Sequence, residues 1–244
     1  MNTMNRYFEI VLGQMQQIRA TQWPKIEQAA FWLGEALAND HWLYAFGTGH
    51  SHLLAEEIFY RAGGLARAAP MLDTRLMLHD KAIEATYVER EEGYAAQLLK
   101  EYPVEAGDVL IVASNSGRNA VPIELALAAR EKGLHVVAII NLAQSKDWPS
   151  RHASGQKLAD VAELVIDNCG VSGDAALALA GLPGRIGPTT TSTGALIVNA
   201  IIVQGIANAL ARGVEQEIYI SSNTCGDDHN NILLQKYKSR IRHL

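Results

Sequence analysis

Cysteine is scarce in this sequence: only Cys169 and Cys225 occur in 244 residues. Two distant cysteines provide neither a disulfide framework nor the closely spaced thiolates of a structural zinc site. This composition is typical of a protein of a reducing compartment, and we expect a cytoplasmic location.

An excess of positive charge is also absent. The chain has 21 lysine and arginine residues against 26 aspartate and glutamate residues, and its net charge is -5 at pH 7. Such a chain has no overall attraction for nucleic acid or for anionic lipid. The basic segment "QKYKSRIRHL" is typical of cations near the end of a helix. We expect neither nucleic acid nor a membrane as a partner.

Long hydrophobic runs are missing too. The amino terminus lacks the basic start, continuous apolar centre and small-residue cleavage site of a signal peptide. The most apolar segment, 194–210, is shorter than the roughly 20 residues that cross a bilayer, and Asn199, Gln204 and Asn208 interrupt it. We interpret it as a core or subunit-interface helix.

Hydrophobic residues nevertheless make up 48% of the chain, enough for a substantial core. Apolar segments such as "VLIVA" and "VVAII" are typical of strands buried on both faces, as in a parallel sheet between helices. The expected strands are 42–46, 108–113, 135–140 and 161–166, with weaker candidates at 65–69 and 217–220. The expected helices are 4–19, 24–39, 51–62, 83–100, 119–132 and 190–211, the second of them opened by Pro24.

The chain has no convincing linker between two domains. The polar segment 141–156 is interpreted as a long loop over a site. We therefore expect one domain, a three-layer α/β/α sandwich with a mainly parallel sheet. Its parts are N-terminal helices in 1–40, an α/β core in 41–212 and a C-terminal extension in 213–244.

Two polar turns follow expected strands. In the first, Gly47 and Gly49 permit a tight bend, and Ser51 falls where a helix would begin, so that its hydroxyl can cap the helix or bind a ligand. The second turn is "SNSGRN", 114–119. Because both turns open at the same edge of a parallel sheet, they predict one polar pocket. Hydroxyls and amides with little fixed charge suit a phosphate monoester.

Other phosphate motifs do not fit these turns. A P-loop needs a Gly-Lys-Ser/Thr sequence, and neither turn has the lysine. A dinucleotide fingerprint needs a small residue where His52 stands, and Asp73 does not clearly close a second strand. We expect no nicotinamide cofactor and no other cofactor.

The two turns resemble those of the sugar isomerase (SIS) domain, over roughly residues 25–212. More closely, the chain resembles bacterial SIS proteins related to phosphoheptose isomerases, through "GTGHSHLLAEEIFYRAGG", "ASNSGRNAVPIE", "SRHASG", "GPTTTSTGALIVNAI" and "DDHN". The resemblance implies a flavodoxin-like fold that binds a sugar phosphate. It selects no reaction, because SIS domains serve aldose–ketose isomerases, an etherase, deaminases and sugar-sensing regulators.

The resemblance also implies a set of phosphosugar-binding residues. Ser51, Ser114, Ser116 and Asn119 would hold the phosphate, although SIS domains usually have threonine or serine in place of Asn119. The complete expected set is Gly47, Thr48, Gly49, His50, Ser51, Ser114, Asn115, Ser116, Gly117 and Asn119.

Isomerisation needs a base that moves a proton between C1 and C2 and an acid that opens the sugar ring. Glu57 and Glu56 lie about one turn into the helix expected after Ser51, and solvated helix-face acids are the alternative. In phosphoheptose isomerases the catalytic glutamate of this helix lies about one turn later, near Arg61. Since SIS sites often borrow a histidine from another subunit, His229 is a candidate acid.

The remaining alternatives concern His229, metal and function. A helix cap with an incidental histidine is the other interpretation of "DDHN", and His79 is a second candidate. The adjacent Asp227, Asp228 and His229 point in different directions, so we expect no required metal.

Three functions stay open for the protein: a phosphosugar isomerase, another SIS enzyme acting on an amino-sugar phosphate, or a non-catalytic phosphosugar sensor. We expect a homodimer or homotetramer.

Overall fold

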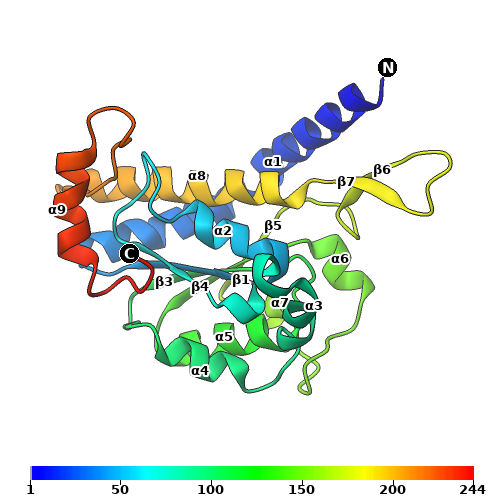
Figure 1. The fold of residues 1–244 in the computed structure, drawn as a ribbon, viewed down its shortest axis with the longest axis horizontal. Coiled ribbons are helices and arrows are strands. Elements are labelled where there is room, and N and C mark those ends of the chain that lie inside the picture. Colours follow the sequence, from blue (N-terminus) through cyan, green and yellow to red (C-terminus); the bar gives the residue numbers. More distant parts are fainter. Residues whose placement is uncertain (1) are drawn as a thin grey trace.

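The computed structural model describes residues 2–244, and a parallel sheet between two layers of helices forms its centre (Figure 1). The strands of this sheet run in the order β2-β1-β3-β4-β5, and each neighbouring pair is parallel. They are β1 (Leu43–Gly47), β2 (Ala68–Met71), β3 (Val109–Ala113), β4 (His135–Ile140) and β5 (Leu164–Asp167). The predicted α/β/α sandwich is confirmed.

The sheet is buried on both faces. Alternate residues of β1 illustrate this, because Leu43 and Ala45 belong to one apolar cluster while Tyr44 and Phe46 belong to the other. The first cluster is closed by α1 (Thr3–Ala38), α2 (His52–Glu57) and α8 (Thr190–Leu210). The second is closed mainly by α4 (Tyr94–Lys100), α5 (Ala120–Glu131), α7 (Leu158–Val161) and α9 (Asp227–Tyr237). Burial on both faces explains why the strand sequences are continuously apolar.

By length and composition alone, helix α8 could cross a membrane, but it packs within the fold. It runs beside the carboxyl-terminal half of α1 (Figure 1). The two helices approach closely at Gly34 and Gly205: a Cβ on Gly34 would lie 2.6 Å from the Cβ of Asn208, and one on Gly205 would lie 2.7 Å from Leu33 Cδ2. One face of α8 therefore lies in the core, while its other face leaves Val203 exposed; the sequence predicted a core or subunit-interface helix.

The predicted helix boundaries need three corrections. The segments 4–19 and 24–39 form one helix, α1, with Pro24 inside it, because Ile18 and Leu33 on either side of the proline pack into the same apolar cluster. The predicted helix 51–62 is shorter, a 3₁₀ turn η1 (Gly49–Ser51) followed by α2.

The predicted helix 83–100 is two helices, α3 (Leu78–Val88) and α4. They separate because Gly93, which precedes α4, has a left-handed backbone with φ 82°. The 3₁₀ turn η2 (Thr74–Leu76) leads into α3. This break matters for the site, because Glu89 directly follows α3.

The weaker strand predictions also change. The segment 65–69 contributes only its end to β2, and 217–220 is no strand but pairs through one isolated bridge between Leu65 and Ile218. The predicted strand 161–166 contains the end of α7 and most of β5. The predicted loop 141–156 contains α6 (Leu142–Asp147), and an antiparallel hairpin of β6 (Ala175–Ala178) and β7 (Arg185–Pro188) was not expected.

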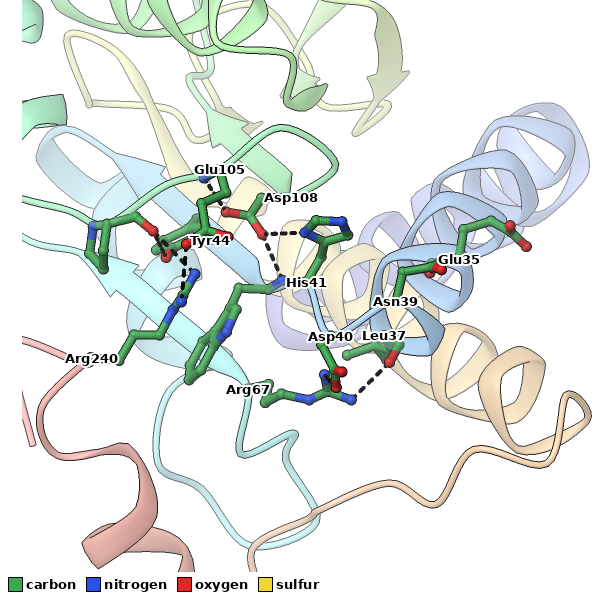
Figure 2. A network of polar contacts seen from close by, with 12 residues as sticks. Glu35, Leu37, Asn39, Asp40, His41, Tyr44, Arg67, Glu105, Asp108 and Arg240 are labelled. Carbon is green, nitrogen blue, oxygen red and sulfur yellow. Dashed lines mark hydrogen bonds and ion pairs between the residues drawn. The ribbon is translucent and has the colours of Figure 1, made fainter.

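A polar network closes the amino-terminal edge of the sheet (Figure 2). Its centre is the fully buried Asp108, whose carboxylate accepts hydrogen bonds from the backbone N–H groups of Trp42 at 2.9 Å and Glu105 at 2.7 Å. Burial raises the pKa of Asp108, although these N–H groups oppose the shift. The carboxylate therefore joins the segments entering β1 and β3, the two strands that carry the polar turns.

The contact between α1 and α8 generates a stability prediction. We expect Gly34→Ala to lower the free energy of unfolding by about 1–3 kcal/mol, because the new methyl group would overlap with the facing helix. Gly13→Ala in the same helix is the control: nothing lies within 4 Å of its added Cβ, so helix propensity should raise stability by up to about 1 kcal/mol. Urea unfolding measures both, and equal effects of the two substitutions would contradict close packing.

The buried network generates a second prediction. We expect Asp108→Asn to lower the free energy of unfolding by about 2 kcal/mol, because an amide nitrogen cannot accept a backbone hydrogen bond. Asp40→Asn provides the control, since that side chain is fully exposed and its ion pair with Arg67 should contribute little to stability. Thermal and urea denaturation compare the variants. Equal stability of both would show that the buried carboxylate does not hold the edge together.

Candidate functional site

The two polar turns leave the sheet side by side. Gly47 at the end of β1 pairs with Ala113 at the end of β3, so the turns begin at the same level of the sheet. Strand order reverses here, because the chain continues from β1 to β2 on one side and from β3 to β4 on the other. Open α/β sheets bind ligands at such a switch point, beyond the carboxyl ends of the strands.

A cavity of about 340 Å³ lies at this point. Seven of the ten residues expected to bind a phosphosugar line it: Thr48, His50, Ser51, Ser114, Asn115, Ser116 and Asn119. The remaining lining residues are Leu54, Glu89, Ala113, Ile139, Gln144, Asn168, Asp174, Pro188, Thr190 and Thr191. Gly47, Gly49 and Gly117 belong to the same turns and shape their backbones. The structure therefore brings the predicted residues of both turns together.

The first turn depends on glycine and leaves a hydroxyl available. A Cβ on Gly47 would lie 2.8 Å from the backbone nitrogen of His52 and nearer still to the carbonyl of Ser51, so a side chain has no room there. The Ser51 side chain does not cap α2, contrary to one of its two expected uses. In the described part of the chain its hydroxyl has no hydrogen-bond partner, and it faces the cavity.

The second turn has a similar arrangement. The hydroxyl oxygen of Ser114 accepts a hydrogen bond from the N–H of Gly117 at 3.2 Å, and Gly117 adopts a left-handed φ of 59°. The half-buried Ser116 hydroxyl has no partner among residues 2–244. Asn119 precedes α5 without capping it, and its Oδ1 accepts a hydrogen bond from Arg151 Nη1 at 3.1 Å.

A carboxylate in the cavity comes from Glu89, which sequence reasoning missed. This residue ends α3, and its Oε2 accepts a hydrogen bond from the Thr48 hydroxyl at 2.7 Å. Its carbonyl accepts the N–H of Val121 at 3.2 Å, which connects it to the start of α5. The sequence did not indicate Glu89 as a site residue, because it predicts one continuous helix over 83–100. The glycine at position 93 was the available signal that this helix ends.

The lining of the cavity includes a second carboxylate, which has a structural role. Asp174 accepts hydrogen bonds from the backbone of Thr189 and Thr190, both at 2.9 Å, and from the Thr190 hydroxyl at 2.8 Å. These bonds cap the amino terminus of α8. The threonines belong to the block "GPTTTSTG", whose hydroxyl content was the available signal for this wall.

The expected catalytic residues Glu57, Glu56 and His229 do not line this cavity. Glu57 accepts a hydrogen bond from Asn199 Nδ2 at 2.6 Å on α8 and pairs with Arg61. Glu56 lies 3.4 Å from His52 Nε2. Nε2 of His229 lies 2.9 Å from the carbonyl oxygen of Ile218. Each of these side chains is held by a partner outside the cavity.

One group of possible metal ligands occurs among the described residues, next to the site. Donor atoms of Glu92, Glu124 and His152 lie within 4.8 Å of one another. Both carboxylates already accept backbone N–H groups, that of Ala153 at 2.7 Å and that of Gly93 at 2.8 Å. These bonds join the loop after α6 to the helices α4 and α5, so the cluster has a structural use without an ion.

Comparison with known proteins agrees with this geometry. Residues 6–141 match the SIS domain family, and a UPF0309 protein of Listeria innocua serovar 6a is 41% identical over 239 residues, 98% of this chain and 97% of the relative. The chain belongs to the SIS domain family and to the UPF0309 proteins. The SIS phosphosugar-binding domain predicted from the sequence is thereby confirmed.

Two solved structures share the SIS fold with this chain. A phosphoheptose isomerase from Francisella tularensis has 16% sequence identity and a TM-score of 0.55, over 84% of this chain and 98% of that chain. A phosphoheptose isomerase from Neisseria gonorrhoeae has 19% identity and a TM-score of 0.52, over 84% of this chain and 96% of that chain. At such low identity the likeness concerns the fold.

Proposed function

We propose that this protein is a phosphosugar aldose–ketose isomerase that acts through an enediolate in the cavity between the two turns. One observation carries the proposal: serine hydroxyls from both turns, without partners among residues 2–244, share a cavity with one imidazole and with a carboxylate that has no capping role. The phosphoheptose isomerases that share the fold support the same reaction class.

The phosphate would bind to the turns. Ser51 and Ser116 would donate hydrogen bonds from hydroxyls that have no partner in the described chain, and the Asn119 amide nitrogen supplies a further donor while its oxygen accepts from Arg151. The starts of α2 and α5 follow these turns, and N–H groups at the start of a helix favour an anion. Binding mainly by neutral donors holds the phosphate and still allows product release.

The proton transfer is assigned to Glu89. Its carboxylate would remove the proton from C2 of the open-chain aldose and return it to C1, while the proton on the C2 hydroxyl moves to the C1 oxygen. The hydrogen bond from Thr48 holds the carboxylate in one orientation. His50, on the same cavity wall, would donate the proton that opens the sugar ring. This assignment replaces Glu57, Glu56 and His229, whose side chains have partners elsewhere.

A second subunit remains part of the proposal. Large apolar side chains are exposed on two helices of the same layer, among them Phe8 of α1, which is 59% exposed, and Val203 of α8, which is 69% exposed. Burial of such residues against a second copy removes apolar surface from water. They support the homodimer or homotetramer expected from the sequence.

A binding measurement tests the first part of the proposal, that the cavity holds a sugar phosphate. We expect Ser116→Ala to weaken the binding of a hexose 6-phosphate about tenfold, which corresponds to the loss of one hydrogen bond to a charged group. Ser51→Ala should act similarly. Ser239→Ala, at the opposite edge of the sheet, is the matched control and should leave the affinity unchanged. Isothermal titration measures all three, and unchanged affinity in both turn variants would place the phosphate elsewhere.

Solvent-deuterium exchange tests the reaction. We expect the wild type to incorporate deuterium at C2 of one or more hexose, heptose or amino-sugar phosphates, and Glu89→Gln to reduce this rate at least about a hundredfold, because the amide cannot accept the proton. Glu57→Gln is the control and should keep most of the rate. If Glu57→Gln loses exchange and Glu89→Gln does not, the base is Glu57. Binding without exchange for any sugar would make the protein a phosphosugar sensor.

A further inference from the structure

Three arginines gather beside the cavity. Arg118 lies within the second turn, next to Asn119, and Arg90 directly follows Glu89. Arg151 comes from the loop after α6 and donates its hydrogen bond to Asn119. Each arginine is therefore a chain neighbour or a hydrogen-bond partner of a residue that lines the cavity.

These arginines have no acidic partner within 4.0 Å in the part of the chain that the structure describes. Other arginines differ: Arg75 pairs with Glu84, and Arg212 pairs with Glu35. The Nε atoms of Arg90 and Arg118 are also buried without a hydrogen-bond partner in residues 2–244. Arg240 Nε is in the same state, but the Nη atoms of Arg240 donate to Glu105 and to the carbonyl of Pro103, whereas no atom of the other two guanidinium groups has a partner there. Buried donors normally have partners, so these two call for an acceptor that the protein does not supply.

The three charges act on one another. The pKa of Arg151 is lowered, first by partial burial and then by the positive charges of Arg118 and Arg90, against which Glu89 acts. Neighbouring like charges disfavour the charged form of each group. An anion bound beside them would supply the missing opposite charge.

The arrangement is also held in place. The N–H of Arg151 donates to the carbonyl of Arg118 at 2.8 Å, and the guanidinium of Arg118 lies 5.8 Å from the ring centre of Trp148. In the next residue of the loop, His152, the Nε2 atom lies 3.4 Å from Glu124 Oε1. The loop after α6 is thus anchored to α5, and Arg151 is held beside Asn119.

We propose that Arg90, Arg118 and Arg151 form a second anion subsite, and that the substrate is a sugar phosphate that also carries a carboxylate. This inference rests on the proposed function, because it assumes that the phosphate occupies the serine-lined turns. A guanidinium forms two parallel hydrogen bonds to a carboxylate, which suits this group better than a sugar hydroxyl.

The position of the arginines favours a second group over the phosphate itself. None of the three lines the cavity between the turns. Arg90 lines an adjoining groove of about 560 Å³ with Ile83 and Tyr87, and His50 belongs to both spaces. A ligand held by its phosphate at Ser51 and Ser116 would therefore meet the arginines with another part of the molecule.

A pair of open-chain ligands tests the inference: gluconate 6-phosphate and glucitol 6-phosphate, which differ only in a carboxylate against a hydroxymethyl group at C1. Isothermal titration of the wild type should find the carboxylate ligand bound at least about tenfold more tightly. Arg118→Gln and Arg90→Gln should each remove most of this difference, while the affinity for glucitol 6-phosphate changes less than about twofold. Arg75→Gln, an exposed and ion-paired arginine, is the control and should keep the full difference.

The possible outcomes separate the two proposals. If the wild type binds both ligands equally, the second subsite is overturned and the proposed function stands. If the arginine variants weaken both ligands to the same extent, the arginines serve the phosphate and the inference again fails. If the wild type binds neither ligand, the proposed phosphosugar site fails and this inference fails with it. Since the wild-type comparison needs no substitution, a variant that does not fold leaves the test intact.

Discussion

The parallel pairing of β1 with β3 is the constraint on which the site depends. It places Gly47 beside Ala113, so that two turns from distant parts of the sequence leave the sheet together and in the same direction. Because the strand order reverses there, no crossover helix covers the space beyond the strand ends, and a cavity remains. The hydroxyls of Ser51 and Ser116 converge in it for this reason alone.

The two edges of the sheet differ in how far their polar groups are hydrogen-bonded. At the amino-terminal edge, the buried carboxylate of Asp108 is satisfied by two backbone N–H groups (Figure 2). The Nε of Arg240 at that edge also lacks a partner in the described chain, but its Nη atoms donate to Glu105 and to the carbonyl of Pro103. At the carboxyl-terminal edge, the hydroxyls of Ser51 and Ser116 and the whole guanidinium groups of Arg90 and Arg118 have no hydrogen-bond partner in the described chain. Since unsatisfied polar groups lower stability, this asymmetry separates the edge that holds the fold together from the edge suited to bind a charged ligand.

The local sequence pattern predicted helices and strands best where the apolar content of a segment and the spacing of its apolar residues indicated the same element. The strands β1, β3 and β4 follow continuous apolar segments, and their boundaries were predicted to within about one residue. Pro24 was misleading because packing on both sides of it keeps α1 continuous. The break between α3 and α4 was missed because the apolar pattern continues through it, and only the backbone of Gly93 marks the end of one helix.

The sequence by itself determined the fold class, the two polar turns and their meeting at one edge, because strand pattern and turn chemistry are local properties. Tertiary structure decided which charged side chains join them. Glu57 lies close in sequence to the first turn, yet Asn199 of α8 holds it outside the cavity. Glu89 and Arg151 are remote in sequence and lie beside the turns, because the ends of α3 and of the loop after α6 are anchored there. Such contacts depend on packing between distant segments, which no local pattern encodes.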